Sequence, residues 1–469
     1  MKPIVIIADD LTGACDTGIK FHNVGLKTRV LTSPLAVGSF LPPDVPVISV
    51  NTCSRCMPAE QAKKVVGSLL AALHDRGDFY LYKKVDSVLR GNVMAEIEGV
   101  FDTLRPDFVI VASAFPENGR YVRGGVLHIC GPQGQKDTLD VLRLFQSQTE
   151  RRCARIDLEV VREGAKAVCA RAQELFGGGA TVLLADAWEQ KDLDILAEVV
   201  TELGSRCIPV GSAGLAQSIA ARFTAEDSQV QTRENTAWTS ALVVVGTRHP
   251  ATLRQLQQLK ERADMKVYVI PTKDITQENL PTIVSRVLEE PINPQGRDGI
   301  LLTTDGIYYG KESCCASLLR NEHNQLILEA LGRGVEALVN MQKISGIVAT
   351  GGDVALEVLN RLHLYWIDLQ TEPMPGIVAG NAGGSPGRNF LITTKSGGFG
   401  GTDALVKMLQ YIGSERMISN PRCFSRYSHV CRIAWCSIFV VMICFPFFSY
   451  ASAVAFSAQL SDSDPPAVK

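Results

Sequence analysis

Short apolar runs recur along the first four hundred residues, and each is followed by a polar or glycine-rich turn and then by a helical spacing of apolar positions. In the first half these runs lie at residues 4–8, 45–50, 79–83, 108–112, 181–185 and 207–210. Buried strands that alternate with helices are typical of parallel βαβ units. The pattern therefore predicts an α/β fold.

A second set of runs begins after residues 220–238, a polar and charged segment that we interpret as a linker. The later runs lie at residues 241–245, 266–270, 299–303, 344–349 and 390–393, with helical patterns at 252–259 and 354–362. A chain of 469 residues exceeds the roughly 250–300 residues that one core supports. We therefore expect two domains, each a mainly parallel sheet flanked by helices.

Composition narrows the choice of partner and compartment. The net charge is −2, which gives no basic footprint for nucleic acid, so small molecules are the expected partners. The thirteen cysteines are odd in number and lack a disulfide spacing, and the chain starts without a secretion signal, which together predict the cytoplasm. The single CxxC, Cys53–Cys56, has no second pair to complete a zinc site. A homo-oligomer is a further expectation for the assembly.

The last residues, 417–469, depart from this scheme and form an atypical apolar C-terminal tail. No charged residue occurs from Ile433 to Ser461, and several arginines precede that run. The layout is that of a secretion signal at the wrong end of the chain, or of a tail anchor. A frameshift or gene junction is the third interpretation. We assign the tail no role in the chemistry, and a membrane is a partner only if the tail is genuine.

Ligands bind beyond the carboxyl ends of strands in open parallel sheets, so chemistry is expected in the segments that come after the strands. In the first half these segments carry charged and hydrogen-bonding side chains: Asp9, Asp10, Arg55, Lys84, Asp86, Ser87, Arg90, Asn92 and Arg120. Guanidinium groups hold carboxylates, whereas Asp and Asn suit neighbouring hydroxyls. The set predicts a pocket for a polyhydroxy acid. The alternative for one of the two adjacent aspartates is a helix cap.

In the second half the corresponding segments are rich in glycine and hydroxyl groups: Thr247, Thr350, Gly351, Gly352, Asp353, Lys395, Ser396, Gly397 and Gly398. Glycines before a helix let backbone N–H groups approach an anion closely. The set predicts a phosphate site, in which Lys395 neutralises phosphate charge. Neither GxGxxG nor GxxxxGK[ST] is present, so the dinucleotide and P-loop motifs are excluded.

Five motifs together carry a family resemblance: ADDLTGA at 8–14, KKVDSVLRGN at 83–92, FPENGR at 115–120, TGGD at 350–353 and KSGGFG at 395–400. Over residues 1–412 the chain resembles the four-carbon acid sugar kinase family. The resemblance implies a sugar-acid-binding domain at 1–232, a nucleotide-binding domain at 238–415, and Mg²⁺-dependent transfer from ATP to the terminal 4-hydroxyl of the acid. D-threonate is the first expectation, and D-erythronate and L-threonate are the alternatives.

The resemblance also implies roles for residues. Asp10, Arg55 and the segment 84–90 would hold the acid, and Thr247, Gly351–Asp353 and 396–398 would hold ATP. Asp353 and Asp10 are the two carboxylates expected near the reacting hydroxyl, and Asp353 would alternatively serve the metal or cap the helix. Metal ligands are left unassigned.

Two other functions are weighed against a kinase. A sugar-acid dehydrogenase would need the dinucleotide motif that the sequence lacks. A non-catalytic sugar-acid sensor would bind the acid without turning over ATP, and the intact glycine turns count against it.

Overall fold

The structure is a computed structural model that describes residues 2–40, 44–130, 136–223, 240–309, 322–384 and 388–419. The chain divides into two units, Met1–Ser414 and Glu415–Lys469, and the elements named below belong to the first, except that its last helix runs on to Ser419. Within the described ranges no helix is both long and apolar enough to cross a bilayer. The interpretations of the tail beyond Ser419, and most of the predicted linker, fall outside the described residues.

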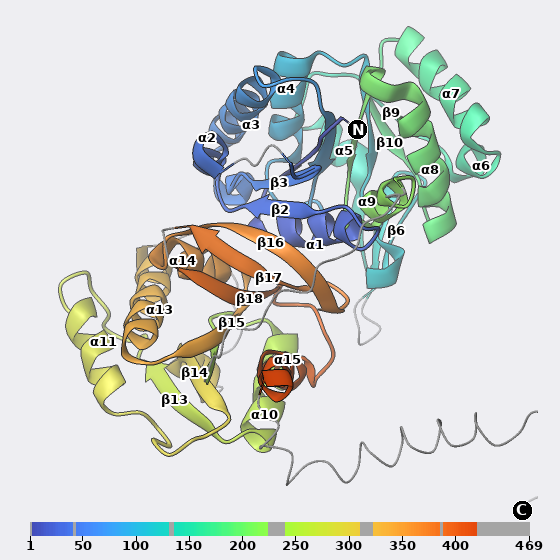
Figure 1. Ribbon diagram of the computed structural model, residues 1–469. Coiled ribbons are helices and arrows are strands. Elements are labelled where there is room, and N and C mark those ends of the chain that lie inside the picture. Colours follow the sequence, from blue (N-terminus) through green and yellow to red (C-terminus); the bar gives the residue numbers. More distant parts are fainter. Residues whose placement is uncertain are drawn as a thin grey trace, which may run out of the picture. The chain divides into compact units, whose positions relative to one another are not determined.

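The first half, residues 2–223, is built on eight parallel strands (Figure 1). In spatial order they are β2 (Thr28–Leu31), β3 (Val47–Asn51), β1 (Ile4–Ala8), β4 (Tyr80–Lys84), β11 (Cys207–Gly211), β5 (Phe108–Ala112), β10 (Val182–Ala185) and β9 (Cys153–Ile156). The six predicted strands of this half are confirmed to within a few residues. β2 and β9 were not predicted, because each is four residues long and carries an arginine.

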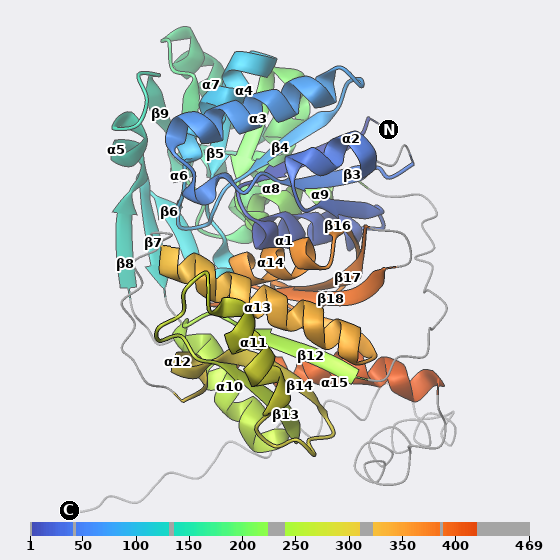
Figure 2. The ribbon, with the colours of Figure 1, turned by 90° about the vertical axis from the view of Figure 1, so that its left-hand side faces the viewer.

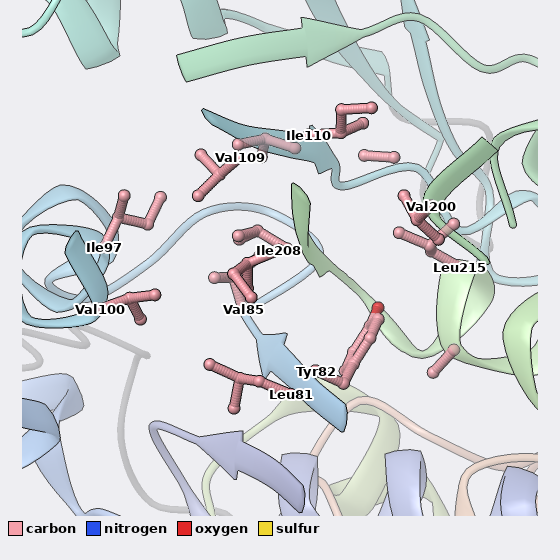
Figure 3. Packing of buried hydrophobic residues seen from close by; sticks show 14 of the residues in the cluster. Leu81, Tyr82, Val85, Ile97, Val100, Val109, Ile110, Val200, Ile208 and Leu215 are labelled. Atoms are coloured by element: carbon pink, nitrogen blue, oxygen red, sulfur yellow. The ribbon is translucent and has the colours of Figure 1, made fainter. Parts of the chain in front are cut away.

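Helices cover both faces of these strands. They are α1 (Leu11–His22), α3 (Ala59–His74), α4 (Val93–Leu104), α7 (Ala165–Gly177), α8 (Gln190–Leu203) and α9 (Ala213–Ala220), with short helices α2 (Val37–Phe40), α5 (Val141–Gln146) and α6 (Leu158–Arg162). In Figure 3, Ile97 and Val100 of α4 lie on one side of the strands, and Val200 of α8 and Leu215 of α9 lie on the other. Because both faces are covered, the strands read as continuous apolar runs.

The second half, residues 240–419, is likewise built of parallel strands flanked by helices. Its parallel strands are β13 (Met265–Ile270), β14 (Gly299–Thr304), β12 (Ser240–Val245), β15 (Ile344–Thr350) and β18 (Asn389–Lys395), in that spatial order. Its helices are α10 (Pro250–Arg262), α11 (Leu280–Glu289), α12 (Asp305–Tyr308), α13 (Glu322–Met341), α14 (Gly352–Arg361) and α15 (Ala404–Ser419). The α/β class and the predicted strands of this half are confirmed.

The two halves share one sheet, which corrects the expectation of a separate sheet for each. Two antiparallel strands, β16 (Leu364–Met374) and β17 (Ile377–Gly384), lie between β18 and β2 and complete a sheet of fifteen strands. At the junction Arg29 of β2 binds Asp368 of β16 through two hydrogen bonds of 2.6 and 2.8 Å. β16 and β17 each start with a short apolar stretch that gives way to polar residues or glycines, so the hydrophobic pattern does not mark them as strands.

A small antiparallel sheet adds a second unpredicted feature. It consists of β6 (Arg120–Arg123), β7 (Val126–Cys130) and β8 (Lys136–Asp140). The β6–β7 turn is held by Asp186, which accepts hydrogen bonds from the backbone N–H groups of Gly124 and Gly125. The sheet matters for function because its first strand begins with Arg120.

Candidate active site

The carboxyl ends of the strands in both halves border one cleft of about 2060 Å³. Every site residue predicted from the sequence lines this cleft except Asn92, Thr350 and Lys395. Helix α1 packs against both β16 and α14, and Figure 2 shows these elements next to one another. The cleft therefore combines the charged segments of the first half with the glycine turns of the second.

Arg55 organises the acidic side of the cleft. Its Nε and Nη2 donate to the two carboxylate oxygens of Asp9, at 2.7 and 2.9 Å, and its Nη1 donates to Asp10 at 2.7 Å. Asp86 lies 3.8 Å from the same guanidinium. Burial opposes ionisation of Arg55, but the nearby charges of Asp10 and Asp9 outweigh it and raise its pKa well above the ordinary value. The guanidinium of Arg55 thus lies within ion-pair distance of three buried or half-buried carboxylates.

Asp86 and Arg90 form a second locked pair. Arg90 donates to both carboxylate oxygens of Asp86, at 2.8 and 2.7 Å, and the backbone N–H groups of Val88 and Arg90 also point at that carboxylate. Burial raises the pKa of Asp86, yet the hydrogen bond and charge of Arg90 hold it below the ordinary value. The turn after β4 therefore presents a rigid, ionised group to the cleft.

Two other cations of the cleft, Lys84 and Arg120, have fewer ion-pair or hydrogen-bond partners. Among the residues that the structure describes, no carboxylate comes within ion-pair distance of the ammonium of Lys84, which lies 3.0 Å from where a Cβ on Gly13 would be. Arg120 donates to the carbonyl of Asn118, while its buried Nε has no hydrogen-bond partner within the described part of the chain. A ligand carboxylate would satisfy both groups.

Asp10 begins helix α1. Its Oδ1 accepts the N–H of Gly13 at 2.8 Å and its Oδ2 accepts the hydroxyl of Thr12 at 2.8 Å, so the predicted cap is Asp10 rather than Asp9. Burial pushes its pKa upward, but the charges of Arg55 and Lys84 and these hydrogen bonds leave it below the ordinary value. A carboxylate held this firmly in the ionised form is a weak acceptor for a substrate proton.

The glycine turns of the second half approach one another closely. Gly351 precedes α14 with φ of +97°, a conformation that glycine adopts without the strain another residue would suffer. A Cβ at Gly397 would lie 2.8 Å from the hydroxyl of Thr247, and one at Gly398 would lie 3.3 Å from Nε2 of His249. Bare backbone at these positions lets N–H groups reach an anion at the N-terminus of α14.

The two sets of groups meet at Gly352. A Cβ at this position would lie 3.4 Å from Oδ2 of Asp10 and 3.5 Å from the hydroxyl of Thr12. The glycine turn before α14 therefore lies against the first turn of α1. Anything bound to the glycine turn reaches the acidic side of the cleft directly.

Asp353 occupies the second position of α14, while Gly351 is the residue before the helix. The alternative in which Asp353 caps this helix is therefore wrong, since the capping position lies two residues earlier. Its side chain is exposed and lines the cleft. A carboxylate in the first turn of a helix that faces the glycine turns fits a role with a cation at the phosphates.

The three predicted residues that do not line the cleft, Asn92, Thr350 and Lys395, lie beneath the turns that do. Asn92 donates to the carbonyls of Ser54 and Met57, which fixes the turn that carries Arg55. Thr350 is buried at the end of β15. Lys395 does not face the cleft as predicted: its ammonium is buried beneath the turn and donates to Thr252 and to the carbonyls of Ser396 and Gly397. Burial lowers the pKa of Lys395 to about 7.

Several contributors were missed by the sequence reasoning. Lys83 and Glu96 form a fully buried ion pair of 2.7 Å, and Glu96 also accepts the hydroxyl of Ser54, so the pair anchors the Arg55 turn. The signal was a lysine inside a strand and a glutamate on the apolar face of α4. His249 caps α10 by accepting the N–H of Ala251 on Nδ1. Burial, then Lys395 and two arginines, lower the pKa of His249, so a neutral ring faces the glycines.

Comparison with known proteins matches both halves. A model of a sugar-binding N-terminal domain covers residues 4–219, and a model of a nucleotide-binding C-terminal domain covers residues 242–405. The crystal structure titled as a putative tRNA synthase from Salmonella typhimurium has a TM-score of 0.69 at 20% identity, covering 87% of this chain and 99% of that one. At this identity the likeness shows the fold alone.

Three curated relatives align over nearly their whole length. A D-threonate kinase from Bordetella bronchiseptica is 30% identical over 436 residues, which are 88% of this chain and 98% of that protein. A D-threonate kinase from Salmonella typhimurium is 27% identical, covering 87% of this chain and 98% of that protein. A D-erythronate kinase from Heliobacterium modesticaldum is 26% identical, covering 88% of this chain and 97% of that protein.

Proposed function

The chain belongs to the four-carbon acid sugar kinase family, and on that premise we propose that it transfers the γ-phosphoryl group of ATP to the terminal 4-hydroxyl of D-threonate. That it is a kinase of a sugar acid follows from its family. The observation that carries the proposal is the contact of Gly352 with Asp10 and Thr12. This contact supports a phosphate site and an acid site that open onto each other.

The first half, residues 1–232, would bind the acid. Its carboxylate would bind Arg120 and Lys84, which have donors to spare, and the adjacent Arg90 adds positive charge. Its hydroxyl groups would donate to Asp9, Asp10 or Asp86, which Arg55 and Arg90 hold in place, with Ser87 nearby. An array of fixed charges of both signs selects a ligand that carries one carboxylate and several hydroxyls.

The second half, residues 238–415, would bind ATP through Thr247, Gly351, Gly352 and residues 396–398. Magnesium in such enzymes is held by one or two carboxylates and by the phosphates themselves. This fits a cleft in which no cluster of three or more metal-ligating side chains occurs among the described residues and in which Asp353 is exposed. The ion would neutralise charge on the phosphates, while the turns and the neutral His249 position them.

The test is an ADP-release assay of the purified protein with ATP, Mg²⁺ and a panel of four-carbon acids. We expect the highest kcat/KM with D-threonate, and D-erythronate and L-threonate are the competing substrates. A wild-type protein that binds an acid of the panel but releases no ADP would be the sensor. Reduction of NAD⁺ in the presence of the acid would instead indicate the dehydrogenase.

We place the enzyme in the cytoplasm. None of the seven cysteines within the described ranges forms a disulfide, which agrees with a reducing compartment. We also propose that identical chains assemble into a homo-oligomer. Light scattering, which gives the mass of the particle in solution, tests this.

A further inference from the structure

Asp16 is a carboxylate of the cleft that neither the motifs nor the family match assigns to a task. It lies on α1 about two turns after Asp10 and lines the same cleft. Its side chain is only 13% exposed, and its buried Oδ1 accepts no hydrogen bond from a described residue. The nearest cation is Lys20, whose Nζ is 4.0 Å away and whose stronger partner is Glu372 of β16 at 2.8 Å.

The other aspartates of the first half that line the cleft are already engaged, and Glu117, which also lines it, is exposed to solvent. Asp9 and Asp10 are bound by Arg55, and Asp86 is bound by Arg90. An engaged carboxylate must break charge-assisted hydrogen bonds before it takes a proton. Asp16 would break none, and it lies on the helix whose first turn contacts Gly352.

We propose that Asp16 is the general base of the phosphoryl transfer, accepting the proton of the attacking hydroxyl. The inference rests on the proposed function. The hydroxyl oxygen forms a bond to the γ-phosphorus, the bond from that phosphorus to the β,γ-bridging oxygen breaks, and ADP leaves with its electron pair. The proton released from the hydroxyl passes to the Asp16 carboxylate and then to solvent.

The surroundings of Asp16 suit this role. Burial raises its pKa to about 6, against the opposing charges of Lys20 and Lys84 and with the support of Glu372 and Asp10. The other titratable groups that feel its charge are the neighbouring thiol of Cys15 and the phenol of Tyr82, whose pKa values burial raises. A carboxyl group whose pKa lies close to neutral pH is ionised at working pH and is still basic enough to take a proton.

The test compares Asp16→Asn with Glu372→Gln, because Glu372 is the other carboxylate on Lys20 and does not line the cleft. We expect Asp16→Asn to lower kcat by about 10²-fold or more with little change in KM for either substrate. Glu372→Gln removes the stronger partner of Lys20, so it should shift the acid limb of kcat to lower pH while lowering the plateau kcat far less than Asp16→Asn does. In the wild type, kcat should fall on the acid side with an apparent pKa near 6, and this limb should be absent in Asp16→Asn. Asp16→Glu should recover part of the activity.

Three results would overturn the assignment: wild-type turnover by Asp16→Asn, an equal loss of kcat in Glu372→Gln, or an acid limb that persists without Asp16. The first and third would show that another group takes the proton, and the second would reduce Asp16 to a partner of Lys20. A wild-type protein that phosphorylates no acid of the panel would overturn the proposed function, and this inference with it.

Discussion

The two sides of the cleft bind charged groups in different ways; the side formed by the first half is called the charged wall, and the side formed by the second half is called the glycine-rich wall. The first half uses side chains, with Arg55 held between Asp9 and Asp10 and Arg90 held by Asp86. The second half uses backbone, with Gly351, Gly397 and Gly398 arranged where a Cβ would obstruct or strain the turn. A sugar acid has a carboxylate and hydroxyls in a particular stereochemical order, and fixed charged groups can distinguish that order. A phosphate chain is nearly uniform, and N–H groups at a helix start suffice.

The largest effect should come from removing the centre of the charged wall. Arg55→Ala leaves Asp9 and Asp10 buried or half-buried without their cation, and losing one partner of such a pair costs about 2–5 kcal/mol. We expect kcat/KM for the acid to fall by about 10³-fold and the melting temperature to fall as well.

The control for this prediction is Arg55→Lys, which keeps the charge but cannot bridge two carboxylates with a planar fork. It should fold and still lose most of the acid affinity, whereas nucleotide affinity measured by calorimetry should be unchanged. An equal loss of nucleotide affinity would show that the two walls are not separate sites.

Asp353 is the one predicted catalytic carboxylate on the glycine-rich wall, and it should have the next largest effect. Asp353→Asn keeps the shape of the side chain and removes its charge. Because Gly351 and not Asp353 precedes the helix, the fold should be intact. We expect kcat to fall by about 10²-fold with an unchanged melting temperature. Wild-type turnover across a Mg²⁺ titration would exclude a role for this charge.

Gly351→Ala should affect nucleotide binding by a smaller factor. The residue has φ of +97°, which costs an alanine about 1–3 kcal/mol, and the strain would displace the start of α14. We expect KM for ATP to rise by about 10-fold with little change for the acid. Gly164 precedes α7 at φ of +106° with open space around it, so Gly164→Ala carries similar backbone strain far from the chemistry. It should lower stability and leave both KM values unchanged.

The smallest expected effect on activity is that of Lys395, whose burial bears on stability and its dependence on pH. Burial lowers the pKa of Lys395 to about 7, against about 10.4 in an unfolded chain. Between these values the unfolded state binds the additional proton, so the free energy of unfolding contributed by this group rises with pH from about 7 to 10 and is lowest below 7. Lys395→Met should remove that slope, so its melting temperature relative to wild type should be highest near pH 6. A difference that is constant from pH 6 to 9 would contradict this assignment.

Local patterns in the sequence account for the features that were predicted correctly. The strands buried on both faces appear as apolar runs, and the groups that line the cleft lie directly after them, which is why the positions of Asp10, Arg55 and Gly352 beside the cleft could be predicted from order along the chain. Strands of mixed polarity such as β16 and β17 could not be found this way, because their partners and not their composition make them strands.

The orientation of side chains was also beyond the sequence. Lys395 stands at a strand end like Lys84, yet one lies under its turn and the other faces the cleft. Asp16 was overlooked because a polar residue on an amphipathic helix is ordinarily exposed to solvent, and only the packing of α1 against β16 and α14 places it in the cleft.

The shared sheet has a consequence for the order in which the chain acquires its structure. Arg29 and Asp368 are separated by 339 positions, so the strands that join the halves meet only after most of the chain has been synthesised. Until then β2 is paired on one side only, with β3, and an open strand edge recruits foreign partners unless charges discourage them. We expect Arg29 of this four-residue strand to supply such a charge before β16 pairs with it, and in the folded protein Asp368 binds the same side chain.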